Sequence, residues 1–105
     1  MEIREFQKLI KKIYYKKDKK RGVEGSFRWL VEEVGELARC LRKIKYPTPG
    51  GLKGKNRQEL KEEFADLLAW LVSLASLVGL DLEEAAKKYK NGCPRCQKKR
   101  CICKE

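Results

Sequence analysis

Apolar residues recur every three or four positions along most of the chain, which is the spacing of one helix face. The first such stretch predicts a helix over residues 2–20. Gly22 and Gly25 interrupt the pattern. Ser26 has the side chain of an N-cap residue, and we expect a second helix to begin there and to run to about Ile44.

A segment rich in proline and glycine, residues 46–55, predicts a loop after the second helix. Asn56 and Glu59 stand at the spacing of a capping box and predict a third helix of roughly 20 residues, which ends at Gly79. This helix is apolar on nearly all of its faces. Because one small domain cannot cover so many apolar faces, we expect a homo-oligomer, a dimer or a tetramer, with the third helix near its interface.

Asp81 and Glu84 repeat the capping spacing and predict a short fourth helix that ends near Asn91. No stretch of the sequence alternates between apolar and polar residues, as a strand would, and there are no internal repeats. The predicted fold class is therefore all-α, a bundle of about four helices. We expect one domain over residues 1–91 and a short basic tail over residues 92–105.

The composition allows a folded domain with a substantial core, because 42% of the 105 residues are hydrophobic. The net charge is +11, with basic residues concentrated in the first 21 positions and in residues 87–104, whereas the middle carries most of the acids. This distribution fits a solvated basic surface, attraction of phosphates to a nucleotide site, or nucleic-acid binding. We find no apolar run of membrane-spanning length and no signal peptide, so we expect a soluble, cytoplasmic protein.

Two acidic clusters lie within the apolar pattern. On the second predicted helix, Glu33 falls on the apolar stripe and Glu36 follows one turn later. On the third, Glu63 and Asp66 are three residues apart and therefore share a face. An ionised carboxylate is costly to bury, and four of them would repel one another. If the two helices pack antiparallel, the pairs meet, and a divalent cation such as Mg²⁺ would neutralise them.

The same residues resemble a known family. The segments LVEEVGELA (residues 30–38) and EEFADLL (residues 62–68) are similar to the EExxE and ExxD motifs of the MazG-like nucleotide pyrophosphohydrolases, within the all-α NTP pyrophosphatase superfamily. The resemblance covers roughly residues 22–91. It implies that four carboxylates coordinate Mg²⁺: Glu33, Glu36, Glu63 and Asp66. It also implies hydrolysis of a nucleoside triphosphate between the α- and β-phosphates, which yields the monophosphate and pyrophosphate.

Within this resemblance, further residues have expected roles. Glu32 is an auxiliary acid, although its position also fits an ordinary surface carboxylate, and either Glu32 or Glu36 could accept a proton from the attacking water. Lys87, Lys88 and Lys90 lie late in the fourth predicted helix, where family members often carry a basic residue that meets the phosphates. Lys53, Lys55 and Arg57 around the loop are competing candidates, and a solvated side chain is the alternative for each of them. Trp29 would stack on a base, or would be an ordinary core aromatic.

The tail contains four cysteines in the pattern C-x2-C followed by C-x-C: Cys93, Cys96, Cys101 and Cys103. Four thiolates complete a tetrahedral zinc site, and the segment has few apolar residues with which to fold without a metal. We therefore expect a zinc knuckle with one structural Zn²⁺. Disulfides, or a disordered basic tail with free thiols, are the alternatives.

The sequence thus predicts an enzyme, a magnesium-dependent nucleoside triphosphate pyrophosphohydrolase. Phosphoribosyl-ATP pyrophosphatase is an alternative within the same superfamily, and the acidic motifs do not separate the two. An alternative from another class is a zinc-knuckle nucleic-acid-binding protein whose helical bundle is only an oligomerisation scaffold. The inward positions of Glu33 and Asp66 favour the enzyme, because a scaffold has no need of buried carboxylates. Nucleic acid is therefore a second, less favoured partner.

Overall fold

The structure, a computed structural model, describes residues 1–44 and 51–105. Its first helix, α1 (Ile3–Arg42), is a single element with a sharp bend at Gly22. Gly22 has φ 82° and ψ 175°, a backbone conformation that essentially only glycine adopts. The chain therefore turns at this residue and the helix resumes at once. The two helices predicted over residues 2–20 and 26–44 are the two halves of α1.

Ser26, which was predicted to be an N-cap residue, does not cap a helix. Ser26 lies inside α1, is completely buried, and has a hydroxyl oxygen without a hydrogen-bond partner among the described residues. Gly25, which was also expected to interrupt the pattern, is helical as well. The prediction for Ser26 was wrong because the second half of α1 begins directly after Gly22. The N–H groups that need a cap lie earlier in the chain than Ser26.

The predicted loop after the second helix falls largely on residues 45–50, which lie outside the described part of the chain. The next helix, α2 (Gly54–Leu77), begins before Asn56, and no side chain caps it. The capping box predicted at Asn56 is therefore wrong. The reason is that Lys53 has the extended backbone of an N-cap residue. Asn56 therefore lies within the first turn of the helix and not at its cap.

The end of α2 and the start of the next helix agree with the sequence pattern, but that helix is shorter than predicted: it was expected to end near Asn91 and ends at Ala86. The N–H groups of Gly79 and Leu80 donate to carbonyls of the last turn of α2 in the arrangement of a Schellman motif. Asp81 then caps α3 (Leu82–Ala86), where its carboxylate accepts a hydrogen bond of 3.0 Å from the N–H of Glu83. A short 3₁₀ helix, η1 (Lys87–Tyr89), follows directly.

The all-α class is confirmed for the described residues, which contain no strand. They contain three α-helices rather than about four, because two predicted helices join through Gly22. No single helix in residues 1–44 and 51–105 is long and apolar enough to cross a membrane. Only α2 taken together with Leu82–Tyr89 meets that test, and these two segments meet at a bend of 105°.

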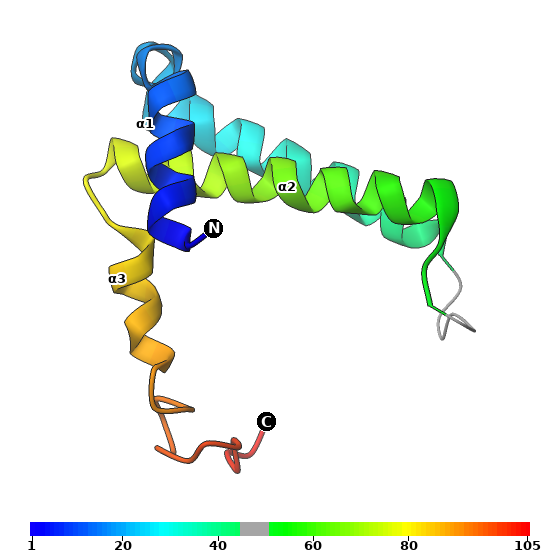
Figure 1. Cartoon of the computed structure of the whole chain (residues 1–105), viewed down its shortest axis with the longest axis vertical. Coiled ribbons are helices and arrows are strands. Elements are labelled where there is room, and N and C mark those ends of the chain that lie inside the picture. The colour runs from blue at the N-terminus through cyan, green and yellow to red at the C-terminus, as the bar shows by residue number, and fades with distance from the viewer. Residues whose placement is uncertain (45–50) are drawn as a thin grey trace.

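The two halves of α1 contact α2 in different ways (Figure 1). The second half runs antiparallel beside α2 along most of its length, whereas the first half crosses the C-terminal end of α2. α3 leaves from that same end, and the tail extends away from the paired helices. The bend in α1 thus makes a two-helix pair with a crossing helix over one end.

Polar contacts fix the corner between α2 and α3. Near the start of α1, Arg4 donates a hydrogen bond of 2.7 Å to Asp81, and this bond lowers the pKa of that carboxyl group. The side-chain amide of Gln7 donates to the carbonyl of Leu80 and accepts from the N–H of Leu82. Because these bonds join α1 to the chain on both sides of Asp81, they set the direction in which α3 and the tail leave the helices.

The hydrophobic core of the single chain is small. The apolar residues buried in the described part are Ile10, Leu60, Val72 and Ala75. On α2, Phe64, Leu68 and Leu71 stay roughly half exposed. The radius of gyration is 16.6 Å, whereas a compact chain of this length would have about 13 Å. The apolar surface of α2 is therefore largely uncovered in one copy of the chain.

The bend at Gly22 generates a stability prediction. Gly22→Ala should destabilise the fold by about 1–3 kcal/mol, because an alanine would be strained at this backbone conformation. Gly35→Ala is the matched control: Gly35 is helical and a methyl group there would meet no atom within 4 Å. We expect Gly35→Ala to be neutral or to stabilise by about 0.5–1 kcal/mol. Urea unfolding of both variants measures the difference, and equal effects would contradict the role of Gly22.

Candidate active site

Three carboxylates meet between the antiparallel helices. Glu33 comes from the second half of α1, and Glu63 and Asp66 come from α2. One carboxylate oxygen of each lies within 4.8 Å of the others. The i, i+3 spacing puts Glu63 and Asp66 on one face of α2, and the antiparallel packing brings Glu33 against that face. Glu33 and Glu63 are half-buried, while Asp66 is exposed.

The electrostatics of this carboxylate cluster are unfavourable without a cation. Burial raises the pKa of Glu33, and the negative charges of Asp66, Glu63, Glu36 and Glu32 raise it further. One oxygen of Glu63 is buried and has no hydrogen-bond partner among the described residues. A buried acceptor without a partner and a carboxylate that is costly to ionise are both relieved by a bound divalent cation.

The other acids of the two motifs lie at the edge of the cluster. Glu36 is half-buried, 3.5 Å from Arg39, and is not one of the three converging carboxylates. Its charge still acts on Glu33 more strongly than that of Glu32, which is exposed. Glu62 is also exposed and accepts a hydrogen bond from Gln58. The structure thus gives Glu36 a position beside the cluster and leaves Glu32 and Glu62 on the surface.

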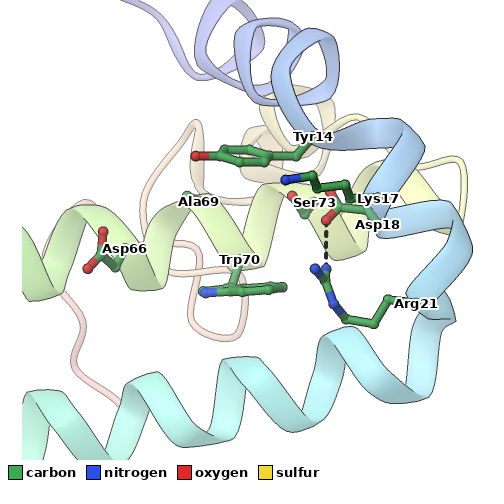
Figure 2. A pocket seen from close by; sticks show the side chains of 8 residues that line it. All are labelled: Tyr14, Lys17, Asp18, Arg21, Asp66, Ala69, Trp70 and Ser73. Carbon is green, nitrogen blue, oxygen red and sulfur yellow. Dashed lines mark hydrogen bonds and ion pairs between the residues drawn. The ribbon is translucent and has the colours of Figure 1, made fainter.

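A cavity of about 270 Å³ opens beside Asp66, where the first half of α1 crosses α2. Figure 2 shows its lining: Tyr14, Lys17, Asp18 and Arg21 come from α1, and Asp66, Ala69, Trp70 and Ser73 from α2. Two cations and two aromatic rings therefore share one cavity with an acid of the cluster. This combination suits a ligand that has both an anionic part and a flat, apolar part.

The sequence analysis did not single out the residues that organise this cavity. Asp18 is buried and pairs with Arg21 at 2.9 Å, and the Arg21 guanidinium lies 4.8 Å from the centre of the Trp70 ring. The sequence does contain an indication that Asp18 pairs with a neighbouring cation. Asp18 is the only acid between Glu5 and Glu24, in an otherwise strongly basic stretch, and it stands three residues before Arg21.

The remaining predicted substrate contacts lie in different places. Trp29 is 44% exposed, so it is neither a buried core residue nor a free ring: it stacks on Trp70, with ring centres 5.8 Å apart. Lys87 and Lys88 lie in η1 and line a separate hollow beside the cysteine-rich tail. Within one chain, Trp29 is thus linked to the cavity at Asp66 through Trp70, and the two lysines line a different surface.

The four cysteines of the tail form a second cluster. Their sulfur atoms all lie within 4.8 Å of one another, and the Sγ atoms of Cys93 and Cys103 are 3.8 Å apart. The sulfurs of a tetrahedral zinc site are separated by about 3.8 Å, since each Zn–S bond is about 2.3 Å. All four cysteines are free thiols, so the disulfide alternative is not what the structure contains.

Local backbone geometry builds the cysteine cluster. The N–H of Cys93 donates to the carbonyl of Lys98, and the N–H of Gln97 donates to the carbonyl of Cys93. Gly92 has φ 105°, and a Cβ there would lie 2.4 Å from the Lys98 carbonyl oxygen, so this close approach requires glycine. The C-P-x-C segment is therefore a closed loop with its thiols turned to one point.

Backbone amides prepare the thiols to act as ligands. The N–H groups of Cys96 and Arg95 donate hydrogen bonds toward the sulfur of Cys93 and lower the pKa of that thiol to about 6. The neighbouring thiols, above all Cys101, raise the pKa of Cys103 to about 11. The thiol of Cys93 therefore ionises readily, and a bound cation would favour ionisation of the other thiols.

Comparison with known proteins agrees with the acidic site. The family model of the MazG nucleotide pyrophosphohydrolase domain matches residues 21–100, most of the chain. The chain belongs to this family. No individual curated protein gave a significant match. The family match includes both halves of the carboxylate cluster, so the MazG domain of this protein indicates a nucleotide substrate and a hydrolytic reaction.

The repulsion in the MazG carboxylate cluster can be tested without metal. Asp66→Asn should leave the melting temperature of the metal-free protein unchanged or raise it by a few degrees, because one of three converging charges is removed. Glu62→Gln removes the same charge from the exposed face of α2 and should have no such effect. Calorimetry in excess chelator measures both variants. A large fall for Asp66→Asn would mean that its carboxylate makes an essential structural contact.

Proposed function

We propose that this MazG domain is a magnesium-dependent nucleoside triphosphate pyrophosphohydrolase that yields a nucleoside monophosphate and pyrophosphate. The observation that carries the proposal is the convergence of Glu33, Glu63 and Asp66 from two helices, within 4.8 Å of one another. The adjacent cavity with two cations and two aromatic rings supports a nucleotide as the ligand. Family membership supports the class of reaction.

The residues present fit Mg²⁺. It is a hard cation that binds carboxylate oxygens and keeps several of its waters, and this cluster offers three carboxylates with an exposed edge at Asp66. The unpartnered oxygen of Glu63 supports the same assignment. We assign Glu33, Glu63 and Asp66 as ligands and Glu36 as a further acid beside them. When bound, the ion would neutralise the triphosphate and lower the pKa of a coordinated water.

The side chains of the cavity would hold the substrate. Lys17 and Arg21 supply positive charge for the phosphates, and Asp18 fixes the guanidinium of Arg21 in place. Tyr14, which is 45% exposed, offers a ring face to a base. The stacking of Trp29 on Trp70 supports an indirect role for Trp29, which would hold the Trp70 ring against the cavity. Lys87 and Lys88 remain predicted phosphate contacts.

Glu36 is the better candidate for the general base. Hydrolysis forms a bond from the water oxygen to the α-phosphorus and breaks the bond to the bridging oxygen, so that pyrophosphate leaves. The proton of the water needs an acceptor. Glu36 lies at the edge of the carboxylate cluster, whereas Glu32 is exposed and its charge is felt least at Glu33. We therefore assign Glu36 as the acceptor of the water's proton and give Glu32 an auxiliary role.

We also propose that the active form is a homo-oligomer, a dimer or a tetramer. The half-exposed apolar side chains of α2 and the large radius of gyration of 16.6 Å support this assignment. A second copy that packs on α2 would bury this surface. It would also enclose the substrate, because the cavity at Asp66 lies on the same helix.

The reaction is tested by pyrophosphate release from a panel of ribo- and deoxyribonucleoside triphosphates and phosphoribosyl-ATP, with magnesium and with excess chelator. We expect metal-dependent release of pyrophosphate and a matching monophosphate. Asp66→Asn should lower kcat/KM by about 100-fold or more, because several kcal/mol of charge stabilisation are lost. Glu62→Gln should keep normal activity. If the protein hydrolyses phosphoribosyl-ATP and none of the nucleoside triphosphates, phosphoribosyl-ATP is the substrate and the proposed one is wrong. Unchanged activity in Asp66→Asn would contradict the proposed site.

We propose that the cysteine cluster holds one structural zinc ion. The spacing of the four sulfurs and the backbone hydrogen bonds to Cys93 support a tetrathiolate site. Zinc bound there would supply the folding free energy that the tail lacks in apolar contacts. A metal at this position does not take part in the hydrolysis, because the cluster lies outside the cavity at Asp66.

The zinc site is tested by metal analysis of protein purified without chelators. We expect one zinc ion per chain, released by a strong chelator or by a thiol-modifying reagent. Cys93→Ser combined with Cys96→Ser should abolish zinc binding. Cys40→Ser is the matched control, because Cys40 lies on α1 away from the cluster and should not affect zinc content. Absence of zinc from the unmodified protein would rule out the assignment.

A further inference from the structure

We propose that the cysteine-rich tail binds single-stranded nucleic acid, in addition to the nucleotide site on the helices. The first observation is the distribution of charge. Residues 87–104 contain eight basic residues and no acid, whereas residues 22–86 contain nine basic and eleven acidic residues. All eight basic side chains of residues 87–104 are exposed, three of them before the tail and five within it. Residues 87–104 and residues 8–21, which hold eight basic residues and one acid, are therefore the two concentrated positive segments of the chain. Of the two, the C-terminal segment extends away from the paired helices (Figure 1).

Little of this positive charge is paired inside the protein, although the Nζ of Lys88 lies 5.7 Å from the centre of the Tyr89 ring. Lys87 pairs with Glu84 at 2.9 Å, and it is the only one of the eight with an ion pair in residues 1–44 and 51–105. A zinc tetrathiolate would contribute a charge of −2, which leaves about +6 on residues 87–104. Basic side chains at this density repel one another unless a polyanion neutralises their charge. An external phosphate-rich ligand is the simplest partner for it.

The tail holds this charge on a fixed loop. The hydrogen bonds between Cys93 and Lys98 and the close approach of Gly92 determine the path of residues 92–99. Arg95 and the run Lys98–Arg100 project from this loop. Fixed cations lose less conformational freedom on binding than cations on an unstructured tail. The arrangement therefore favours a binding surface over a solvated run of charge.

Aromatic and basic side chains share the hollows of this surface. A hollow of about 420 Å³ is lined by Tyr89 and Lys99 with the loop around Cys93, and Tyr89 is 64% exposed. An adjoining hollow, lined by Lys87, Lys88 and Gln97, shares Gly92, Cys93 and Pro94 with it. A base can stack on the ring of Tyr89 while its phosphates meet the lysines. Ile102, 71% exposed, adds apolar surface nearby.

These features favour a single strand over other polyanions. Duplex grooves are read by a helix or a two-stranded ribbon, and the tail beyond η1 contains neither. Stacking on an exposed ring needs unpaired bases. An anionic membrane would attract the lysines, but the surface offers only Tyr89 and Ile102 as large exposed apolar groups to insert. Single-stranded RNA or DNA therefore fits the surface best.

The test is fluorescence anisotropy of the full chain with labelled oligo-U and oligo-dT of about 12 nucleotides, a typical single-strand site size. We expect binding at low salt with a slope of log affinity against log salt near −3.5, if about five phosphates are contacted. A triple charge reversal in the tail, Lys98→Glu, Lys99→Glu and Arg100→Glu, should weaken binding at least about tenfold. Tyr89→Ala should weaken it about fivefold or more, and Tyr89→Phe should preserve it.

The matched control has the same change in charge on the exposed face of α1: Lys12→Glu, Lys16→Glu and Lys20→Glu. This control should change the affinity by less than about threefold. Zinc content and circular dichroism verify that each variant is folded. Equal losses in both triple variants, no binding, or binding of duplex as tight as of single strands would overturn the proposal. So would binding to phosphatidylserine vesicles without binding to the oligonucleotides. Triphosphate hydrolysis by the tail variant, expected to be normal, separates this proposal from that for the enzyme.

Discussion

The turn at Gly22 is the constraint on which the site depends. Because α1 bends there, one helix contacts α2 twice. Its second half runs beside α2 and brings Glu33 to Glu63 and Asp66, and its first half crosses α2 and places Arg21 beside Trp70. A straight helix could make only one of these contacts. The carboxylate cluster and the cavity at Asp66 are thus adjacent because a single residue changes the direction of the chain.

The acidic side chains of the protein differ in how their negative charge is compensated. The acids converge where two helices pack, and burial together with mutual repulsion raises the pKa of Glu33. Asp18, the one fully buried acid among the described residues, is compensated by Arg21 within the protein. Within residues 1–44 and 51–105, Glu33, Glu63 and Asp66 form no ion pair, so a bound cation would be the simplest compensation for their charges. The cysteine cluster follows the same principle, since its neighbouring thiols raise the pKa of Cys103 and a bound metal would favour the thiolate.

The local predictions that the structure confirms and those that it contradicts differ for identifiable reasons. The cap at Asp81 and the helix end at Gly79 were predictable because both depend on side chains and hydrogen bonds within a few residues. Ser26 and Asn56 have the right residue types for caps, yet neither caps a helix. In each case a neighbouring residue, Gly22 or Lys53, had already fixed the backbone. Residue type alone therefore located elements but not their first turns.

The sequence by itself determined the all-α class, the i, i+3 carboxylate pairs and the four-cysteine pattern, because these follow from periodicity and spacing along one chain. Only the tertiary structure decided which acids converge, why Glu36 stands beside the other three, and that Trp29 packs on Trp70. It alone showed the cavity formed by Tyr14, Lys17 and Arg21. The physical reason is that such contacts join residues distant in sequence, and their geometry depends on one backbone bend whose direction no local pattern encodes.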